Sequence, residues 1–375
     1  MKTQRRGTPD FLLLILVFLL TGFGIVMVFS ASSPSSSIDF GDPLYFTKRQ
    51  LIFAALGIFG MFLLMNIPYQ VFKKWFLPLF LIVVFLLFAV LFTEDINGAR
   101  SWIPIGSFSL QPSEFAKLAV IMYLSALISK KGDKITNFKK GLLPALIIVG
   151  FAAMLVLLQP DVGTAMIIIL SSLVVIIAGG ARFKQLFTAA FAVSAPASLL
   201  LAFYLMFKPE TLGVRFHRFT TYLDPWQDRL GSGLQIIQSL LAFGHGGVTG
   251  AGFGQSIQKL HYLPEAHNDF IFAIIGEELG FIGCSIFLFI YLFTLWRGLL
   301  IALRCNDPFG TLLGTGIVGI LSIQAFINMG GVTNLIPMTG VTLPFISYGG
   351  SSLLVSLAGM GILLSISRDN NRKDS

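Results

Sequence analysis

The segment FLLLILVFLLTGFGIVMVFS, residues 11–30, decides the fold class of this chain. It contains no charged side chain, and a helix of about 20 apolar residues spans the roughly 30 Å hydrocarbon core of a bilayer. The basic start before it, MKTQRRGTPD, is typical of a signal peptide, but the apolar core of a signal peptide has only about 7–15 residues. We therefore predict that residues 11–30 form a first membrane span that is retained.

The composition extends this conclusion to the whole chain. Of 375 residues, 55% are hydrophobic and 12% are charged, whereas a soluble domain has about 25% charged residues. This difference excludes a soluble globular enzyme, a disordered chain and a coiled coil. The two cysteines, Cys284 and Cys305, lie in unrelated contexts, so we predict no disulfide bond.

Ten apolar runs are long enough to cross a bilayer. They lie near residues 11–30, 50–66, 76–93, 114–129, 142–158, 163–179, 186–207, 270–296, 309–329 and 346–366. The runs are continuous, unlike the alternating pattern of a β-barrel, and a backbone exposed to lipid must satisfy its own hydrogen bonds in helices. The sequence predicts an all-α integral membrane protein, with a single polytopic domain over 1–375 and ten transmembrane helices.

The distribution of charge tests this count, because cytoplasmic loops are enriched in Lys and Arg. Ten spans place both termini on one side, and that side receives 17 of the 26 basic and 5 of the 18 acidic residues. The net charge of +8 therefore divides into +12 on the side of the termini and −4 on the other side. We predict cytoplasmic termini. The basic excess reflects topology, and no nucleic-acid partner is expected.

The unusual loops are all on the outer side. Residues 31–49 are rich in serine and are expected to be mobile. Residues 208–268 form a large extracytoplasmic loop between helices 7 and 8, with an interfacial helix near 233–243. Its apolar residues recur at helical spacing, at Leu234, Ile237, Leu240 and Leu241. Six glycines between 244 and 254 predict an interrupted helix and close backbone approach.

Ionisable residues at membrane depth are costly, so each one suggests a function. In YLPEAHNDFIFAIIGEELG, residues 262–280, Asp269 lies at the start of the eighth span. Alone, Asp269 could be a helix cap. Glu277 and Glu278 follow about two helical turns later and cannot be caps. At least one of them is expected to face a polar interior and to pair with a base.

Further candidates come from three other outer segments. Glu114 and Lys117 are three residues apart on one helix face, so they form either a local ion pair or a site for an anionic headgroup. Arg100 and Trp102 suit either an interfacial anchor or a phosphate contact. Asp161 precedes a predicted helix, where a capping role is the more common one.

Several chemistries are not supported by the sequence. No P-loop is present, so ATP is not expected to drive the protein, and neither HExxH nor GxSxG occurs. His261 and His267 near Asp269 leave open a weak divalent-cation site. Outward-facing carboxylates beside outward-facing cations suit a lipid-linked substrate that carries phosphate, with a carboxylate as base on a hydroxyl.

Several long motifs, in order along nearly the whole chain, carry a family resemblance. They are NGARSWIPIG with QPSEFAKL, QPDVGTA, YLDPWQDRLGSGLQIIQSLLAFG, QKLHYLPEAHNDFIFAIIGEELGFIG and GVTLPFISYGGSSL. The chain resembles the SEDS family (shape, elongation, division and sporulation), which includes FtsW, RodA and SpoVE. DPWQD and PEAHNDF are more similar to the FtsW and SpoVE branches than to RodA.

The resemblance implies a peptidoglycan glycosyltransferase in the bacterial cytoplasmic membrane. It would polymerise lipid II at the outer face during division or cell-wall synthesis, with Asp269 as general base and inversion at the donor sugar. The family motif commonly reads HTDF, and Asn268 replaces its Thr here. The resemblance also implies a class B penicillin-binding protein and other divisome or elongasome membrane proteins as partners.

The expected site therefore combines one catalytic residue with a set of substrate-binding candidates. These candidates are Arg100, Trp102, Glu114, Lys117, Asp161, Arg215, Arg218, Lys259, Glu265, His267, Glu277 and Glu278. Arg100, Lys117, Arg215 and Arg218 are the candidates for the two phosphates, together with a divalent cation, Mg²⁺ or Mn²⁺, if one is used. Two other functions stay open from the sequence: a lipid II flippase and a non-catalytic divisome scaffold.

Overall fold

A computed structural model describes residues 7–93, 101–106, 108–188, 191, 222–229, 231 and 233–371. The long helices are α1 (Phe11–Phe40), α2 (Tyr45–Asn66), α3 (Tyr69–Ala89), α4 (Pro112–Lys131), α5 (Leu143–Leu157), α6 (Val162–Ala178), α9 (Leu234–Gly246), α10 (Ile271–Leu303), α11 (Pro308–Val332) and α12 (Gly350–Asn370). Short helical turns are η1 (Val90–Phe92), η2 (Gly132–Thr136), η3 (Phe138–Leu142) and η4 (Pro225–Asp228).

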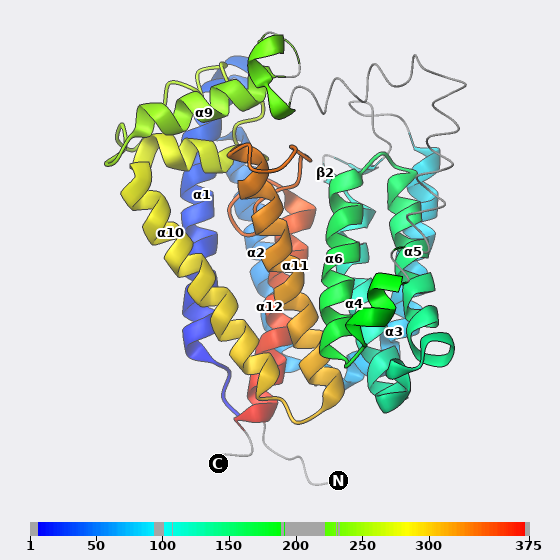
Figure 1. The fold of residues 1–375 in the computed structure, drawn as a ribbon. Helices are drawn as coiled ribbons and strands as arrows, with labels where there is room; N and C mark the ends of the chain where they lie inside the picture. Colours follow the sequence, from blue (N-terminus) through cyan, green and yellow to red (C-terminus); the bar gives the residue numbers. More distant parts are fainter. Residues whose placement is uncertain are drawn as a thin grey trace, which may run out of the picture.

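The described helices form a bundle around three central members, α4, α11 and α12 (Figure 1). Within their apolar windows, 83% of the α12 residues are buried, whereas only 17% of the corresponding α3 residues are buried. α12 packs against α2, and α11 packs against α10, α6 and α4. Peripheral helices therefore present apolar side chains outward, as membrane helices do.

Eight described helices are long and apolar enough to cross a membrane, and α6, with 17 residues, is a shorter apolar helix. These nine match nine of the ten predicted spans in order. Most of the seventh predicted span, 186–207, lies outside the described residues. The chain is thus a multi-pass helical membrane protein, and the count of ten stays a prediction.

The prediction of a mobile serine-rich loop over residues 31–49 is wrong. α1 continues to Phe40 and ends at Gly41, whose φ of 68° suits glycine, and α2 already begins at Tyr45. Within this extension of α1, Ser35 Oγ donates a hydrogen bond to Ser32 O at 3.0 Å. Serine hydroxyls can be satisfied inside a helical bundle, so the polar composition concealed a helix that extends beyond the first apolar run.

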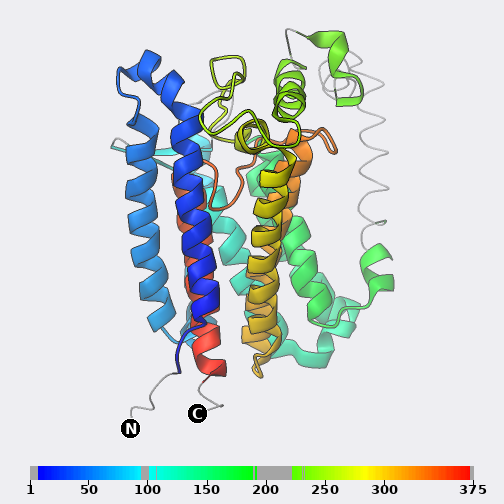
Figure 2. The same ribbon diagram turned by 90° about the vertical axis from the view of Figure 1, so that its left-hand side faces the viewer.

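The two ends of the bundle differ. At one end, which we call the inner end, the described N-terminal segment is tied to α12: Asp10 N donates to Ser367 Oγ, Arg368 Nε donates to Gly7 O, and Asn371 Nδ2 donates to Thr8 O. The opposite, outer end carries α9, the 247–270 segment and the 333–349 segment (Figures 1 and 2).

A β-hairpin at the outer end was not predicted. β1 (Ile103–Ile105) pairs antiparallel with β2 (Phe108–Leu110), with Ile103 opposite Leu110. Gly106 in the turn has a φ of 62°, which glycine adopts without strain. The IPI and FSL segments were too short to stand out beside the membrane spans.

α10 is broken near its start. Gly280 has a φ of 65°, and in both views the two turns before it lie across the outer end while the remainder descends along the bundle (Figures 1 and 2). The facing loop closes on the break, since Ala251 N donates to Glu277 O and Phe281 N donates to Gly247 O. The position expected two turns deeper for Glu277 and Glu278 is therefore wrong, because the kink keeps both in the outer layer.

The helix α9 overlaps the expected helix near 233–243, and its buried face only partly matches the expected one. Ile237 is buried as expected, Leu241 is exposed, and the buried face is completed by Ile236, Ser239 and Ala242. The helix also includes Gly244 and Gly246, so the expected interruption begins later. Close approach does occur: a Cβ added at Gly246 would lie 2.1 Å from the carbonyl oxygen of Gly276 in α10. The placement of α9 at a leaflet stays a prediction.

Candidate active site

Asp269 lies two residues before α10 and does not cap it. The N-cap position belongs to Phe270 and has no side-chain cap bond. Among the described residues, no side chain donates a hydrogen bond to the Asp269 carboxylate. Burial raises its pKa to about 6, and the negative charge of Glu265 adds to the shift. Asp269 is thus largely ionised at neutral pH and is a stronger base than an exposed aspartate.

Buried polar atoms without hydrogen-bond partners occur in the segments next to this carboxylate. Within the described part of the chain, His267 Nε2, Asn268 Oδ1, Asn328 Oδ1 and Thr339 Oγ1 are buried and have no hydrogen-bond partner. All four belong to segments that adjoin Asp269. Buried polar groups in proteins are usually paired, so such a group of unpaired atoms indicates a place for water or substrate hydroxyls.

The backbone around Asp269 is held by α11. Asn328 Nδ2 donates to the carbonyl of Asp269 at 2.7 Å and to the carbonyl of Val341 at 2.8 Å. A Cβ added at Gly340 would lie 3.8 Å from Asp269 Oδ2. One amide thus joins the two segments that meet at the carboxylate.

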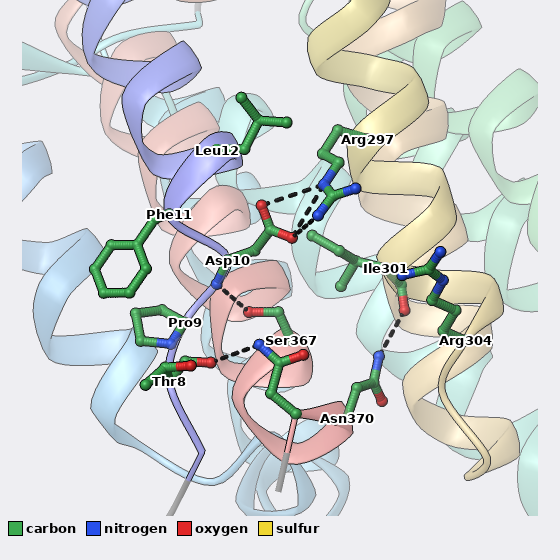
Figure 3. A pocket seen from close by; sticks show the side chains of 11 residues that line it. Thr8, Pro9, Asp10, Phe11, Leu12, Arg297, Ile301, Arg304, Ser367 and Asn370 are labelled. Atoms are coloured by element: carbon green, nitrogen blue, oxygen red, sulfur yellow. Dashed lines mark hydrogen bonds and ion pairs between the residues drawn. The ribbon is translucent and has the colours of Figure 1, made fainter. Parts of the chain in front are cut away.

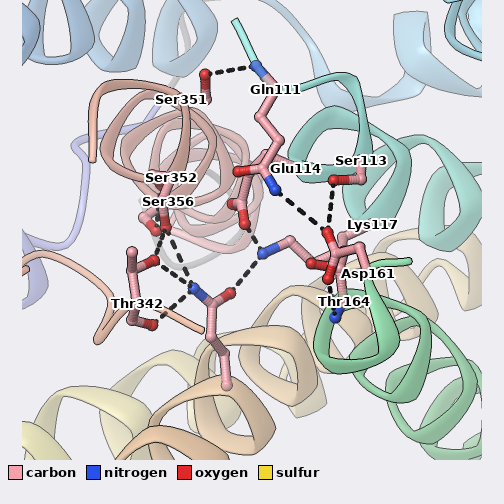
Figure 4. Close-up of polar contacts among 11 residues, drawn as sticks. Gln111, Ser113, Glu114, Lys117, Asp161, Thr164, Thr342, Ser351, Ser352 and Ser356 are labelled. Atoms are coloured by element: carbon pink, nitrogen blue, oxygen red, sulfur yellow. Dashed lines mark hydrogen bonds and ion pairs between the residues drawn. The ribbon is translucent and has the colours of Figure 1, made fainter. Parts of the chain in front are cut away.

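A buried ion pair between Glu114 and Lys117 lies among the helices and is linked through Gln324 to the segment that contains Val341 and Thr342 (Figure 4). Lys117 Nζ is 2.8 Å from Glu114 Oε2 and 2.6 Å from Gln324 Oε1. Gln324 Nε2 then donates to Thr342 O at 2.9 Å and lies 3.2 Å from Ser352 Oγ. The local ion pair expected from the spacing of Glu114 and Lys117 is confirmed. Lys117 also reaches the Val341–Thr342 backbone through Gln324.

Asp161 caps α6, as its sequence position suggested. Its Oδ1 accepts from Thr164 N at 2.9 Å, and its Oδ2 accepts from Ser113 Oγ at 3.1 Å and Gln111 Nε2 at 3.2 Å. A Cβ added at Gly163 would lie 3.0 Å from the carbonyl of Thr339. The starts of α4 and α6 are thus fastened together beside the segment that passes Asp269.

Aromatic side chains form a wall next to His267. Its ring centroid lies 4.2 Å from that of Phe46 and 5.5 Å from that of Tyr348, and Tyr348 N donates to His267 O at 2.9 Å. Burial lowers the pKa of His267 to about 4, so the ring is neutral at physiological pH. The Arg49 guanidinium lies over the Tyr45 ring, 4.4 Å from its centroid, and partly offsets the rise that burial causes in the pKa of Tyr348.

Arg49 was not among the predicted site residues. It is half-buried at the start of α2, and through Tyr348 it belongs to the wall beside His267. In the sequence it follows Lys48 in a segment that resembled a mobile loop. Only the fold shows that this guanidinium is near the carboxylate segment.

The remaining predicted carboxylates form a second, separate cluster. Glu277 accepts from Ile257 N at 3.0 Å, from Ser256 Oγ and from Gln258 N, and its Oε1 is 2.9 Å from His245 Nδ1. These contacts fasten the loop after α9 to α10.

Glu278 completes this cluster on the side of α1. Lys259 Nζ lies 2.8 Å from Glu278 Oε1, and Ser30 Oγ donates to the same carboxylate at 2.6 Å. The prediction that one of the two glutamates pairs with a basic residue is confirmed, because Glu278 pairs with Lys259. Glu277 and Glu278 are fully engaged by protein groups, so their predicted substrate contacts stay untested.

Five other predicted residues have weaker support or lie outside the described residues. Trp102 is half-buried and starts the hairpin segment, and its carbonyl accepts from Thr93 Oγ1 at 3.2 Å. Glu265 is exposed and accepts from Asn268 Nδ2. The predicted phosphate-binding residues that lie outside the described residues are Arg100, Arg215 and Arg218.

Metal and disulfide expectations can be compared with the described chain. No group of three or more His, Cys, Asp or Glu side chains able to hold a metal ion occurs among the residues that the structure describes. Cys284 and Cys305 are both free and buried, as predicted.

Comparison with known proteins agrees with this geometry. A family model described as "Cell cycle protein" (FtsW/RodA/SpoVE) matches residues 10–372. The chain belongs to the FtsW/RodA/SpoVE family. It is 46% identical to stage V sporulation protein E of Bacillus subtilis (strain 168). The alignment extends over 370 residues and covers 98% of this chain and 99% of that protein.

A second relative and two solved structures extend this result. The probable peptidoglycan glycosyltransferase FtsW of Geobacter sp. (strain M18) is 42% identical over 362 residues, 96% of each chain. A chain from a structure titled "Structural coordination of polymerization and crosslinking by a peptidoglycan synthase complex" matches with a TM-score of 0.79 at 29% identity, covering 96% and 98% of the two chains. Thermus thermophilus RodA matches with a TM-score of 0.70 at 29% identity, covering 96% and 97%.

Proposed function

We propose that this FtsW/RodA/SpoVE protein is a peptidoglycan glycosyltransferase that polymerises lipid II, with Asp269 as general base. The observation that carries the proposal is the Asp269 carboxylate itself. It is free of side-chain donors among the described residues, has a pKa raised to about 6, and adjoins several unpaired buried polar atoms. A general base needs this combination of accessibility to a substrate proton and a pKa near the operating pH.

The reaction proposed at this carboxylate is a substitution at a sugar carbon. Asp269 accepts the proton of the 4-hydroxyl of the acceptor N-acetylglucosamine, and the oxygen attacks the anomeric carbon of the donor muramyl sugar. The bond from that carbon to the undecaprenyl pyrophosphate oxygen breaks, and the configuration inverts. The proton held by Asp269 then passes to solvent or to the departing pyrophosphate, so the base is regenerated.

Negative charge on the departing pyrophosphate must be stabilised. Arg49 lies over the Tyr45 ring in the wall beside His267, and it joins the sequence-based candidates Arg100, Arg215 and Arg218 for this role. Lys117 is less suited, because it is buried and already shared between Glu114 and Gln324. Lys259 is likewise engaged, by Glu278 and Ser30.

A divalent cation such as Mg²⁺ or Mn²⁺ would be held between a carboxylate of this site and phosphate oxygens of the substrate. Mg²⁺ commonly binds through one or two carboxylates together with phosphate oxygens of the substrate. Asp269 and Glu265 are the two carboxylates whose charges interact at this end. A bound cation would neutralise pyrophosphate charge, and binding of labelled lipid II with and without a chelator tests this separately from turnover.

The cellular setting is part of the same proposal. The charge asymmetry supports cytoplasmic termini and an active site on the extracytoplasmic face of the inner membrane. The similarity to a chain of a peptidoglycan synthase complex supports a partner that crosslinks, for which a class B penicillin-binding protein is the expected type, with other divisome or elongasome membrane proteins around it. The large loop over 208–268, with α9 at the leaflet, would guide the lipid substrate.

The alternatives of flippase and scaffold are less well supported. A flippase needs a path for a polar headgroup across the bundle, but the space beside Glu114, Lys117 and Gln324 is only about 10 Å³, roughly enough for one water molecule. A scaffold needs neither a carboxylate with a raised pKa nor a group of unpaired buried polar atoms.

One assay separates the three functions. Purified protein, with and without its partner, receives labelled lipid II in detergent and in vesicles. Polymer formed by the native chain and lost in Asp269→Asn supports the enzyme. The matched control is Asp42→Asn, which changes a partly exposed outer carboxylate that accepts hydrogen bonds from Lys48 Nζ and Leu44 N. Leaflet exchange without polymer would indicate a flippase, and full polymerisation by Asp269→Asn would exclude Asp269 as the base.

A further inference from the structure

A polar pocket lies at the inner end, at the opposite end of the bundle from the proposed active site (Figure 3). It has a volume of about 260 Å³ and is lined by the start of α1, the end of α10 and the end of α12. Arg297 and Arg304 both line it. The proposed glycosyltransferase mechanism uses none of these residues.

The charge of the pocket is set by three side chains. Arg297 is paired with Asp10, with Nη2 2.7 Å and Nε 3.0 Å from Asp10 Oδ2. Arg304 is exposed and has no acceptor among the described residues. The pair is neutral as a unit, so Arg304 gives the side chains that line the pocket a net charge of +1.

Nearby acidic groups are engaged elsewhere. Asp307 caps α11 by accepting from Phe309 N, and Asp369 accepts from Gln70 Nε2. Residues 1–6, which precede the pocket in the chain, carry three basic and no acidic side chains. The neighbouring N-terminal sequence therefore offers no carboxylate to neutralise Arg304.

The surroundings of the pocket are apolar. Phe11 is 60% exposed and Leu12 is 40% exposed, and both line the pocket, while Ile15 and Leu303 beside it are 60% exposed. Apolar side chains exposed on the outside of a membrane bundle face acyl chains. A polar, cationic recess that borders such a surface at the ends of membrane helices matches an anionic headgroup with its attached chains.

We propose that this pocket binds the phosphate headgroup of an anionic phospholipid from the leaflet at the inner end. Arg304 would contact the phosphate directly, and Arg297, oriented by Asp10, would supply its free Nη1. The acyl chains would lie along Phe11, Leu12 and Leu303. The bound lipid would thereby join the ends of α1, α10 and α12.

Two variants with opposite expected effects test this proposal. One surface charge contributes about 1 kcal/mol to binding of an anionic lipid, which is about fivefold in Kd. Arg304→Gln removes a positive charge and is expected to weaken binding about fivefold. Asp10→Asn removes the negative charge beside Arg297 and is expected to strengthen binding by a similar factor. The capping bond to Leu13 N survives this change, since asparagine is also a good N-cap.

The experiment uses the full chain in neutral detergent, titrated with fluorescent phosphatidylglycerol and, in parallel, with fluorescent phosphatidylcholine. The matched control is Lys139→Gln, which removes an exposed inner-end charge away from the pocket. The opposite shifts for Arg304→Gln and Asp10→Asn, with no shift for Lys139→Gln, support the site. Equal weakening by Lys139→Gln, equal binding of phosphatidylcholine, or displacement of the lipid by millimolar inorganic phosphate would overturn it. Asp269→Asn should bind the lipid as the native chain does.

Discussion

Replacing Asn328 by leucine tests whether the amide that joins Asp269 to Val341 positions the base. Leucine has a similar volume, so packing within α11 changes little, but the bonds at 2.7 and 2.8 Å are lost. Two buried carbonyls then lack a donor, at about 1–3 kcal/mol each. The substitution also removes Asn328 Oδ1, which has no partner in the described chain, and this offsets about 1–3 kcal/mol. The net cost is about 1–3 kcal/mol.

That cost should fall on catalysis more than on folding. The bonds join two outer segments, whereas the helices of the bundle are held by apolar packing elsewhere. If the whole net cost raises the barrier, kcat falls about 5-fold to 150-fold, since about 1.4 kcal/mol corresponds to tenfold.

Initial rates of lipid II polymerisation at several lipid II concentrations separate kcat from KM. The expected result is a lower kcat with KM and Tm close to native. Asn137→Leu, which changes an exposed asparagine at the inner end, is the control and should keep native kcat. A native kcat in Asn328→Leu, or a loss explained entirely by unfolding, would refute a positioning role.

Three further predictions concern ionisation, the second cluster and the kink. Because Asp269 must be deprotonated to act as base and its pKa is about 6, kcat/KM should fall about tenfold per pH unit below 6 and level off above 7; a flat profile from pH 5 to 8 would contradict this. Lys259→Met leaves Glu278 buried without its cation and should cost about 3–5 kcal/mol of stability, measured as Tm. Adding Glu278→Gln should recover most of the loss, and a double variant as unstable as the single one would argue against the pair. Gly280→Ala places a Cβ 2.2 Å from a backbone nitrogen of the facing loop at a φ of 65° and should lower Tm by several degrees, whereas Gly22→Ala, with open space around it, should not.

The class of the protein could be predicted from the sequence because hydrophobic length is a local property. Each apolar run predicts a membrane span without reference to the rest of the chain. Nine of the ten runs have a matching apolar helix in the described chain. Asp161 as a cap and Glu114 with Lys117 as a local pair follow the same logic, because their partners lie within a few residues.

Contacts between distant segments could not be predicted in this way. Ser30 reaches Glu278 across 248 positions of the chain, and this contact accounts for a buried hydroxyl at the end of the first predicted span. Lys117 reaches Gln324 across 207 positions, and Asn328 reaches Asp269 across 59. No periodicity in the sequence reports such pairings.

The residues predicted to form one site fall into two separate clusters, and the tertiary structure explains why. Asp269, Glu277 and Glu278 are close in sequence, so they were expected to act together. The left-handed turn at Gly280 and the loop that closes on it direct Glu277 and Glu278 into contacts that fasten the outer layer. Asp269 remains without a side-chain donor among the described residues.

The sequence by itself determined that the chain crosses a membrane repeatedly, which side is basic, and which carboxylate merits attention, because the cost of placing charge in lipid acts on each segment separately. Only the tertiary structure decided which of the few charges are neutralised by protein partners and which is left for a substrate. Neutralisation requires two groups within about 3 Å of each other, and the packing of distant helices sets that distance.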